Sequence, residues 1–113
     1  MHEYSVGQAL MDRIAAEAAA HGAIAVHRIR LKIGELSGVE PDLLASAFAI
    51  LKERTLCEHA ALDIDRVPAR WVCPSCAGDI PPGAVLRCRA CGDAARLSGG
   101  DEIVLAQLEM EVP

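Results

Sequence analysis

Residues 71–93, WVCPSCAGDIPPGAVLRCRACGD, decide how the rest of the chain is organised. They contain two Cys-x-x-Cys pairs, Cys73/Cys76 and Cys88/Cys91, which are separated by 11 residues. A two-residue gap lets both thiolates of a pair turn toward one cation, and the second pair completes the tetrahedron that zinc prefers. Few aliphatic residues remain here to form a core, so bound metal would supply the folding energy. The segment therefore predicts a zinc-ribbon lobe with a closed, structural metal site.

The chain has five cysteines, and four of them form these two pairs. In a reducing cytosol, close pairs indicate metal binding or redox chemistry and not a disulfide framework. Iron of the rubredoxin type and a dithiol redox pair are the alternatives to zinc. The fifth cysteine, Cys57, lies between an expected helix and an expected strand, and we expect its thiol to be buried and inert.

Alternating strands flank the cysteine segment on both sides. Residues 61–67 (ALDIDRV) precede it, and residues 102–112 (EIVLAQLEMEV) follow it and give the clearest strand of the chain. A period of two is typical of a strand with one buried face. We expect that face of the last strand to carry Val104, Ala106, Leu108, Met110 and Val112. The cysteine segment is thus predicted to be inserted between two strands.

Two helices and one more strand come earlier in the sequence. Residues 4–21 predict a helix that ends at Gly22, and residues 26–33 predict a strand. Pro41 suits the first turn of a second helix, which we expect to reach about Arg54. The residues expected to face the core are Val6, Leu10, Ile14 and Ala18 of the first helix, Ile29, Leu31 and Ile33 of the strand, and Leu44, Ala47, Phe48 and Leu51 of the second helix.

These elements predict an α+β fold in which two helices pack on a three-stranded sheet that carries the inserted zinc-ribbon lobe. We expect one domain from residues 1–68 plus 100–113 and a second from residues 69–99. Hydrophobic residues make up 52% of the chain, but there is only one Trp, one Tyr and one Phe. The core is therefore expected to be aliphatic.

Composition also excludes several functions. A formal net charge of −5 argues against a nucleic-acid partner, because binding of that kind depends on Lys and Arg. No apolar run reaches the ~20 residues of a membrane span, and the start does not resemble a signal peptide, so we expect a cytoplasmic protein. No catalytic signature is present, and we do not expect an enzyme. His21, His27 and His59 are expected to be structural or solvated.

The first three residues, Met1, His2 and Glu3, offer a second set of metal donors. The α-amine, the amide nitrogen of His2 and its imidazole Nδ1 can close a five-membered and a six-membered chelate ring on one metal. Three nitrogens in a plane suit Ni(II) or Cu(II), and Glu3 can add an oxygen. The alternative is an ordinary solvated chain end.

The stretches MHEYSVGQAL, IGELSGVEPDLLASAF and GGDEIVLAQLEMEVP, together with the paired cysteines, occur in this order across the whole chain. In this combination the sequence resembles the hydrogenase nickel-incorporation metallochaperone family (HypA/HybF). The resemblance implies a nickel-binding lobe of two helices and a three-stranded sheet, joined to a zinc ribbon. It further implies that Met1, His2 and Glu3 bind Ni(II) as cargo. The implied structural zinc ligands are Cys73, Cys76, Cys88 and Cys91.

The resemblance also implies partners. The family delivers nickel to the large subunit of [NiFe]-hydrogenase together with the maturation GTPase HypB, and in some organisms it serves urease maturation as well. Some members place histidines beside the zinc cysteines, whereas here no histidine follows His59. The fourth nickel ligand is therefore expected from Glu3 or from a partner. Monomer and homodimer both remain open.

Two other function classes compete with nickel delivery. A zinc-ribbon interaction module, such as a transcription or RNA-associated adaptor, would need zinc alone and would tolerate any residue at position 2. A dithiol oxidoreductase would need the paired cysteines free of zinc.

Overall fold

The computed structural model describes residues 2–76, 78–81 and 85–113, without the side chain of His2. The elements in chain order are α1 (His2–Ala20), β1 (Ala25–Gly34), α2 (Pro41–Leu51), β2 (Ala61–Val67), β3 (Arg70–Val72), β4 (Asp79–Ile80), β5 (Arg96–Gly99) and β6 (Ile103–Glu111). In this part of the chain, neither helix combines the length and the apolar character needed to cross a membrane.

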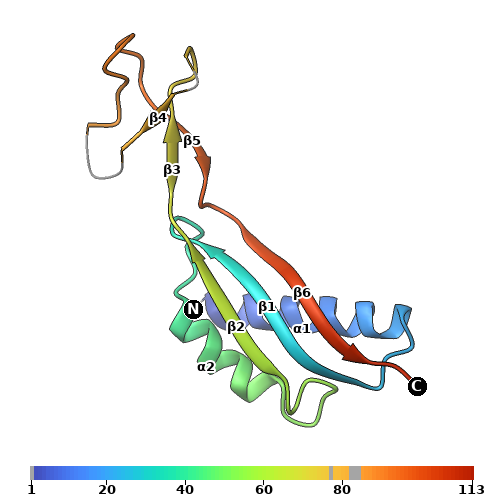
Figure 1. Ribbon diagram of the computed structural model, residues 1–113. Coiled ribbons are helices and arrows are strands. Elements are labelled where there is room, and N and C mark those ends of the chain that lie inside the picture. The colour runs from blue at the N-terminus through green and yellow to red at the C-terminus, as the bar shows by residue number, and fades with distance from the viewer. Residues whose placement is uncertain (1, 77, 82–84) are drawn as a thin grey trace.

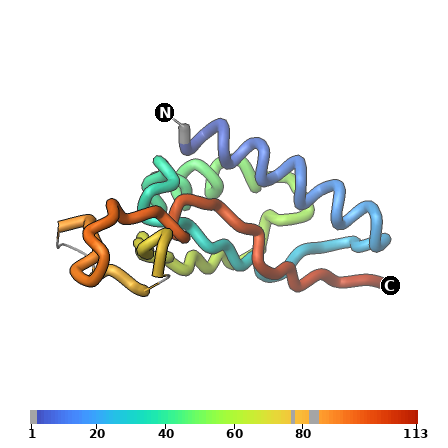
Figure 2. The backbone as a smooth tube through the Cα atoms, turned by 90° about the horizontal axis from the view of Figure 1, so that it is seen from above, coloured from blue at the N-terminus to red at the C-terminus, as the bar shows by residue number. Residues whose placement is uncertain are grey.

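The elements form two separate sheets. The larger has the strand order β2-β1-β6, with β1 parallel to β2 and antiparallel to β6, and the smaller has the order β4-β3-β5. Both helices lie on one face of the larger sheet (Figure 1). The segment from β3 to β5 projects from the end of that sheet at which α1 begins (Figure 2). The predicted fold class is confirmed, including the insertion of the cysteine segment before the last strand.

The helix α1 packs through the predicted stripe. Leu10, Ile14 and Ala18 are buried, and Gly22 ends the helix with a φ of 65°, which glycine adopts without strain. The helix begins at His2, two residues earlier than the sequence predicted. The proposed nickel-binding residues therefore adjoin the first turn of a helix.

The central strand β1 separates an apolar face from a charged face. Ile29, Leu31 and Ile33 are buried against the helices, as predicted. On the opposite face Arg28 contacts Asp63 at 2.5 Å, and Arg30 lies 4.0 Å from Asp65. The core cluster also includes Leu44 and Phe48 of α2.

The helix α2 begins as the sequence predicted and ends earlier. Pro41 occupies its first turn, and the Glu40 carboxylate caps it by accepting a hydrogen bond from the Leu43 N–H at 3.0 Å. The helix ends at Leu51 and not near Arg54. Arg54 has a φ of 62°, which lies outside the right-handed helical region and prevents the helix from reaching it.

The prediction of the buried face of β6 was partly wrong. In the antiparallel pairing of β1 with β6, Arg30 lies opposite Gln107, but the next residue, Leu31, lies opposite Leu105. Ala106 therefore has no partner in β1 and forms a bulge. Such a bulge moves the residues beyond it to the other face. The residues that pack against the core are Leu105, Leu108 and Met110, whereas Val104 and Val112 are exposed.

The chain crosses itself where the cysteine segment joins the larger sheet. A Cβ atom added to Gly34 would lie 2.3 Å from the carbonyl carbon and oxygen of Gly100, so the two main chains touch. The loop after Gly34 forms hydrogen bonds with both chain segments that connect the larger sheet to the small one. The Glu35 N–H donates to the Val67 carbonyl at 2.8 Å, and the Leu36 N–H donates to the Gly100 carbonyl at 2.7 Å. The GELSG stretch therefore holds this junction together.

We expect Gly34→Ala to destabilise the zinc-loaded protein by about 2–3 kcal/mol, because the new methyl group would overlap main chain that cannot move aside as a side chain does. Chemical denaturation followed by circular dichroism measures the change. Gly99→Ala is the matched control, since a Cβ there meets nothing within 4 Å. Equal stability of the two variants would contradict the close packing of Gly34.

Candidate metal centres

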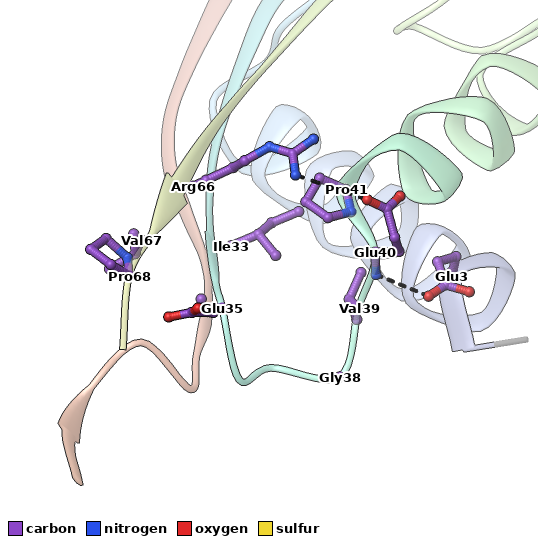
Figure 3. Close-up of a pocket in the computed structure, with 11 residues that line it drawn as sticks. Glu3, Ile33, Glu35, Gly38, Val39, Glu40, Pro41, Arg66, Val67 and Pro68 are labelled. Carbon is purple, nitrogen blue, oxygen red and sulfur yellow. Dashed lines mark hydrogen bonds and ion pairs between the residues drawn. The ribbon is translucent and has the colours of Figure 1, made fainter. Parts of the chain in front are cut away.

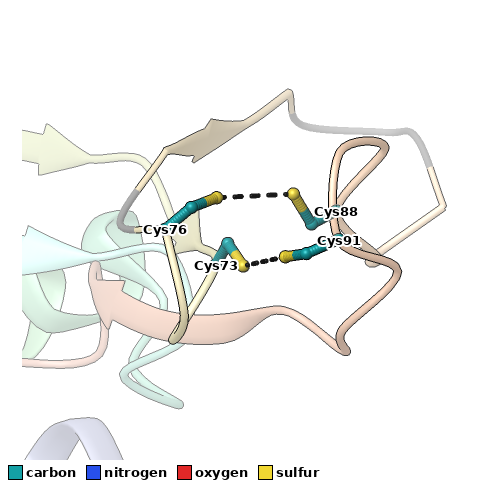
Figure 4. A group of neighbouring side chains, drawn as sticks. All are labelled: Cys73, Cys76, Cys88 and Cys91. Carbon is teal, nitrogen blue, oxygen red and sulfur yellow. Dashed lines mark hydrogen bonds between the residues drawn. The ribbon is translucent and has the colours of Figure 1, made fainter.

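The four paired cysteines come together at the end of the small sheet. Their Sγ atoms all lie within 4.8 Å of one another. Cys73 lies 3.0 Å from Cys91, and Cys76 lies 3.6 Å from Cys88, measured between the sulfurs (Figure 4). Both distances are far longer than the ~2.05 Å of a disulfide. The Cys76–Cys88 distance is close to the ~3.8 Å that separates two sulfurs in a tetrahedral zinc site with Zn–S bonds of about 2.3 Å, and the Cys73–Cys91 distance is shorter. The donor set therefore fits structural zinc.

Each cysteine pair lies in a tight turn held by main-chain hydrogen bonds. The Cys73 N–H donates to the Gly78 carbonyl at 3.0 Å, and the Cys88 N–H donates to the Asp93 carbonyl at 2.9 Å. Gly92 closes the second turn with a φ of 74°. The two turns therefore bring the four sulfurs together in a segment that has few buried apolar residues among those described.

The thiols influence one another's protonation when no metal is bound. A hydrogen bond from Cys91 lowers the pKa of Cys73 to about 6, and the pKa of Cys91 rises to about 12 because its proton is held by Cys73. Because zinc binds thiolates, loading the site releases protons. In the described part of the chain, this is the only group of three or more His, Cys, Asp or Glu side chains placed closely enough to hold a metal. None of the histidine side chains that the structure describes belongs to this group.

The predicted nickel site is described only in part. Met1 and the side chain of His2 lie outside the described residues. Glu3 is only 8% exposed, and its carboxylate accepts a hydrogen bond from the Glu40 N–H at 3.1 Å. That bond is the main reason why the pKa of Glu3 falls from 4.5 to about 2. Glu3 is therefore an ionised group that joins the start of α1 to the start of α2.

A cavity of about 640 Å³ adjoins Glu3 (Figure 3). Apolar walls come from Ile33, Val39, Pro41, Val67 and Pro68, and charged side chains come from Glu3, Glu35, Glu40 and Arg66. Arg66 contacts Asp42 at 3.2 Å. Glu40 and Arg66 are not among the predicted site residues. Their meeting with Glu3 depends on contacts between distant segments, which no local pattern reveals.

The remaining histidines and the fifth cysteine take the expected places. The His21 ring lies 2.9 Å from the Glu17 carbonyl, and His27 contacts Glu111 at 2.8 Å. His59 is an exposed neighbour of Glu58. Cys57 is buried at 1% exposure, and that burial raises the pKa of its thiol.

Known proteins resemble this chain along nearly its full length. Residues 1–110 match the family described as "Hydrogenase/urease nickel incorporation, metallochaperone, hypA". The chain is 38% identical over 112 residues to hydrogenase maturation factor HypA of Nitrosospira multiformis, with 97% of each chain covered. It is 36% identical to the protein of that name from Desulfitobacterium hafniense, with 98% of this chain and 99% of the relative covered.

Solved structures agree with these sequences. The solution structure of the Ni metallochaperone HypA from Helicobacter pylori is similar, with a TM-score of 0.73, 30% identity and 98% of each chain covered. A second solution structure of HypA protein gives a TM-score of 0.79 at 31% identity, over 100% of this chain and 98% of the other. The chain therefore belongs to the HypA family of hydrogenase and urease nickel-incorporation metallochaperones.

Proposed function

We propose that this chain carries Ni(II) at its N-terminus and, with the GTPase HypB, delivers it to the large subunit of [NiFe]-hydrogenase in the cytoplasm. Met1, His2 and Glu3 would form the cargo site, while Cys73, Cys76, Cys88 and Cys91 would hold structural zinc. The observation that carries the proposal is the place of Glu3. Its buried, ionised carboxylate anchors the first turn of α1 beside a cavity, so the start of this helix is fixed to the start of α2.

The start of a helix suits the donors that the proposal requires. The first four N–H groups of an α-helix have no intrahelical acceptor, so the amide nitrogen of His2 is not needed for α1. Nickel binding through the amine, this amide and the imidazole displaces protons and weakens as the pH falls. The positive end of the helix dipole opposes a cation, and the Glu3 carboxylate offsets that effect.

The two proposed metal sites differ in how readily they can exchange metal. Four thiolates leave zinc no open coordination position, which fits a permanent structural role. Planar nitrogen donors at a chain end leave nickel accessible, so a partner with a better set of ligands can remove it. The proposed activity is therefore transfer of a metal ion, without a chemical reaction catalysed by this chain.

We propose that residues 1–68 plus 100–113 form the nickel domain and that residues 69–99 form the zinc domain. Support comes from the loop after Gly34, which lines the cavity beside Glu3 and also binds the junction. There the Glu35 carboxylate accepts a hydrogen bond from the Ala69 N–H at 2.8 Å. Through this loop, nickel loading would therefore change how the two domains are oriented relative to each other.

A transfer experiment tests the function. Tag-free, zinc-loaded protein carrying one radioactive nickel is mixed with nickel-free hydrogenase large-subunit precursor, HypB and GTP. We expect the precursor to take up nickel from the loaded protein at a higher rate than from free nickel at the same concentration. HypB should raise the rate of this transfer further. Nickel-free urease with its maturation proteins replaces the hydrogenase in a parallel arm. Transfer to neither client at a rate above that of free nickel would refute the proposal.

We expect Glu3→Gln to lower the stability of the nickel-free protein at neutral pH. Because the folded pKa of Glu3 (about 2) is below its ordinary value of 4.5, its contribution is complete above pH 4.5 and declines as the pH falls toward 2. The difference in urea midpoint between Glu3→Gln and the parent should therefore shrink between pH 7 and pH 3. Asp12→Asn on the exposed side of α1 is the control. A difference that does not depend on pH would contradict the role of the Glu3 charge.

A further inference from the structure

The zinc domain, residues 69–99, extends away from the helices and the larger sheet (Figure 1). The molecule measures 57 × 28 × 17 Å along its principal axes, and β3 packs chiefly against β4 and β5 of its own sheet. Two chain segments, residues 67–69 and 99–101, connect the zinc domain to the nickel domain. The orientation of the two domains therefore depends on these connections and on the bonds that hold them.

One side chain binds across the boundary between the domains. The Glu35 carboxylate accepts a hydrogen bond from the Ala69 N–H at 2.8 Å. Among the described residues, this is the only hydrogen bond or ion pair between the zinc domain and the nickel domain. The main-chain hydrogen bonds of the junction end at Val67, Gly100 and Glu102, which all belong to the nickel domain.

Glu35 is itself fixed to the nickel domain. Its N–H donates to the Val67 carbonyl at 2.8 Å, and its side chain points away from Glu3, toward the side on which Val67 and Pro68 lie (Figure 3). Glu35 is exposed, so water competes for its carboxylate. A hydrogen bond of ordinary net strength favours the bonded arrangement by about five- to tenfold. Such a bond holds one orientation and still allows it to open.

The backbone of both connections permits rotation once this bond is open. Gly99 and Gly100 follow each other in one connection, and Gly100 has a φ of 89°, which glycine adopts without strain. In the other connection the ring of Pro68 fixes its φ, so rotation is left to the ψ of Pro68 and to Ala69. The bond from Glu35 acts on the Ala69 N–H and therefore restrains the peptide about which this connection turns.

We propose that Glu35 is a positioning residue that fixes the orientation of the zinc domain, and that the zinc domain turns about the two connections when the bond to Ala69 opens. The proposal uses the two domains of the proposed function, but its test does not involve nickel. The loop from Glu35 to Glu40 also leads to the cargo site, because the Glu40 N–H is bound by Glu3. A movement of the first turn of α1 would therefore reach Glu35 through one short loop.

Nuclear magnetic resonance relaxation of ¹⁵N-labelled, zinc-loaded, nickel-free protein tests this proposal. In the parent protein, the amides of both sheets should report the same rotational correlation time. In Glu35→Ala, the amides of β3 and β5 should report a shorter correlation time than those of β1 and β6. The Ala69 amide proton should also exchange with water about fivefold faster or more. Glu35→Gln keeps an oxygen acceptor and should restore the parent behaviour.

Glu58→Ala is the matched control. The Glu58 carboxylate also accepts a hydrogen bond from a main-chain N–H, that of Arg54, at 2.8 Å, but both residues belong to the nickel domain. This variant should keep a single correlation time, and all variants should retain one zinc.

Any of four results would overturn the role of Glu35. These are independent tumbling of the two domains in the parent protein, a single correlation time in Glu35→Ala, loosening by Glu58→Ala to the same extent, and failure of Glu35→Gln to restore the parent behaviour. A failure of nickel delivery would change none of these relaxation measurements, so it would count against the proposed function alone.

Discussion

His2→Ala, and separately acetylation of the α-amine of Met1, are expected to abolish stoichiometric nickel binding while the zinc content stays unchanged. The proposed chelate needs the α-amine directly next to the His2 amide, so that the two fused rings can close. Alanine removes the imidazole, and acetylation converts the amine of Met1 into an amide that no longer has a free lone pair for the metal. We expect each change to weaken nickel binding at least about 100-fold, which corresponds to about 2.7 kcal/mol.

Calorimetry and absorption spectroscopy of tag-free protein titrated with Ni(II) measure this effect. His21→Ala is the matched control, because it removes an imidazole from just beyond the other end of α1, where the ring lies 2.9 Å from the Glu17 carbonyl. It should bind one nickel as the parent does. If His2→Ala and the acetylated chain also bind as the parent does, MHE is an ordinary chain end. A zinc-ribbon adaptor would then be the better account of the protein.

Cys73→Ser, or removal of zinc by a chelator, is expected to unfold the segment from β3 to β5 while the larger sheet remains folded. The small sheet has strands of three, two and four residues, and between positions 69 and 99 only Cys73 and Ile80 are buried hydrophobic residues among those described. So little buried surface cannot fold a segment of this length alone. Structural zinc contributes about 10–16 kcal/mol in small domains of this kind.

The single tryptophan, Trp71 in β3, reports on this segment. Its fluorescence should shift to the red when zinc is lost, while the helical circular dichroism signal of α1 and α2 remains. Cys57→Ala is the control, since Cys57 belongs to the core of the larger sheet and should retain one zinc. An unchanged Trp71 spectrum in zinc-free protein would contradict a metal-dependent fold. Thiols that form disulfides in the purified protein instead of holding zinc would favour a dithiol oxidoreductase.

The sequence by itself determined the features that depend on local spacing. The Cys-x-x-Cys pairs identified the metal-binding segment, the stripe of Leu10, Ile14 and Ala18 identified the first helix, and Pro41 marked the start of the second. These predictions succeeded because turn geometry, helical periodicity and capping involve residues only a few positions apart.

Only the tertiary structure decided the contacts between distant segments. Periodicity tells which side chains are buried, but not which strand lies beside which or in what register. The bulge at Ala106, which the sequence did not predict, therefore places Leu105 and not Val104 on the buried face of β6. In the same way, Glu3 meets the Glu40 N–H, and Gly34 touches Gly100, because packing of the whole sheet and its helices brings together main-chain groups that no short sequence pattern connects.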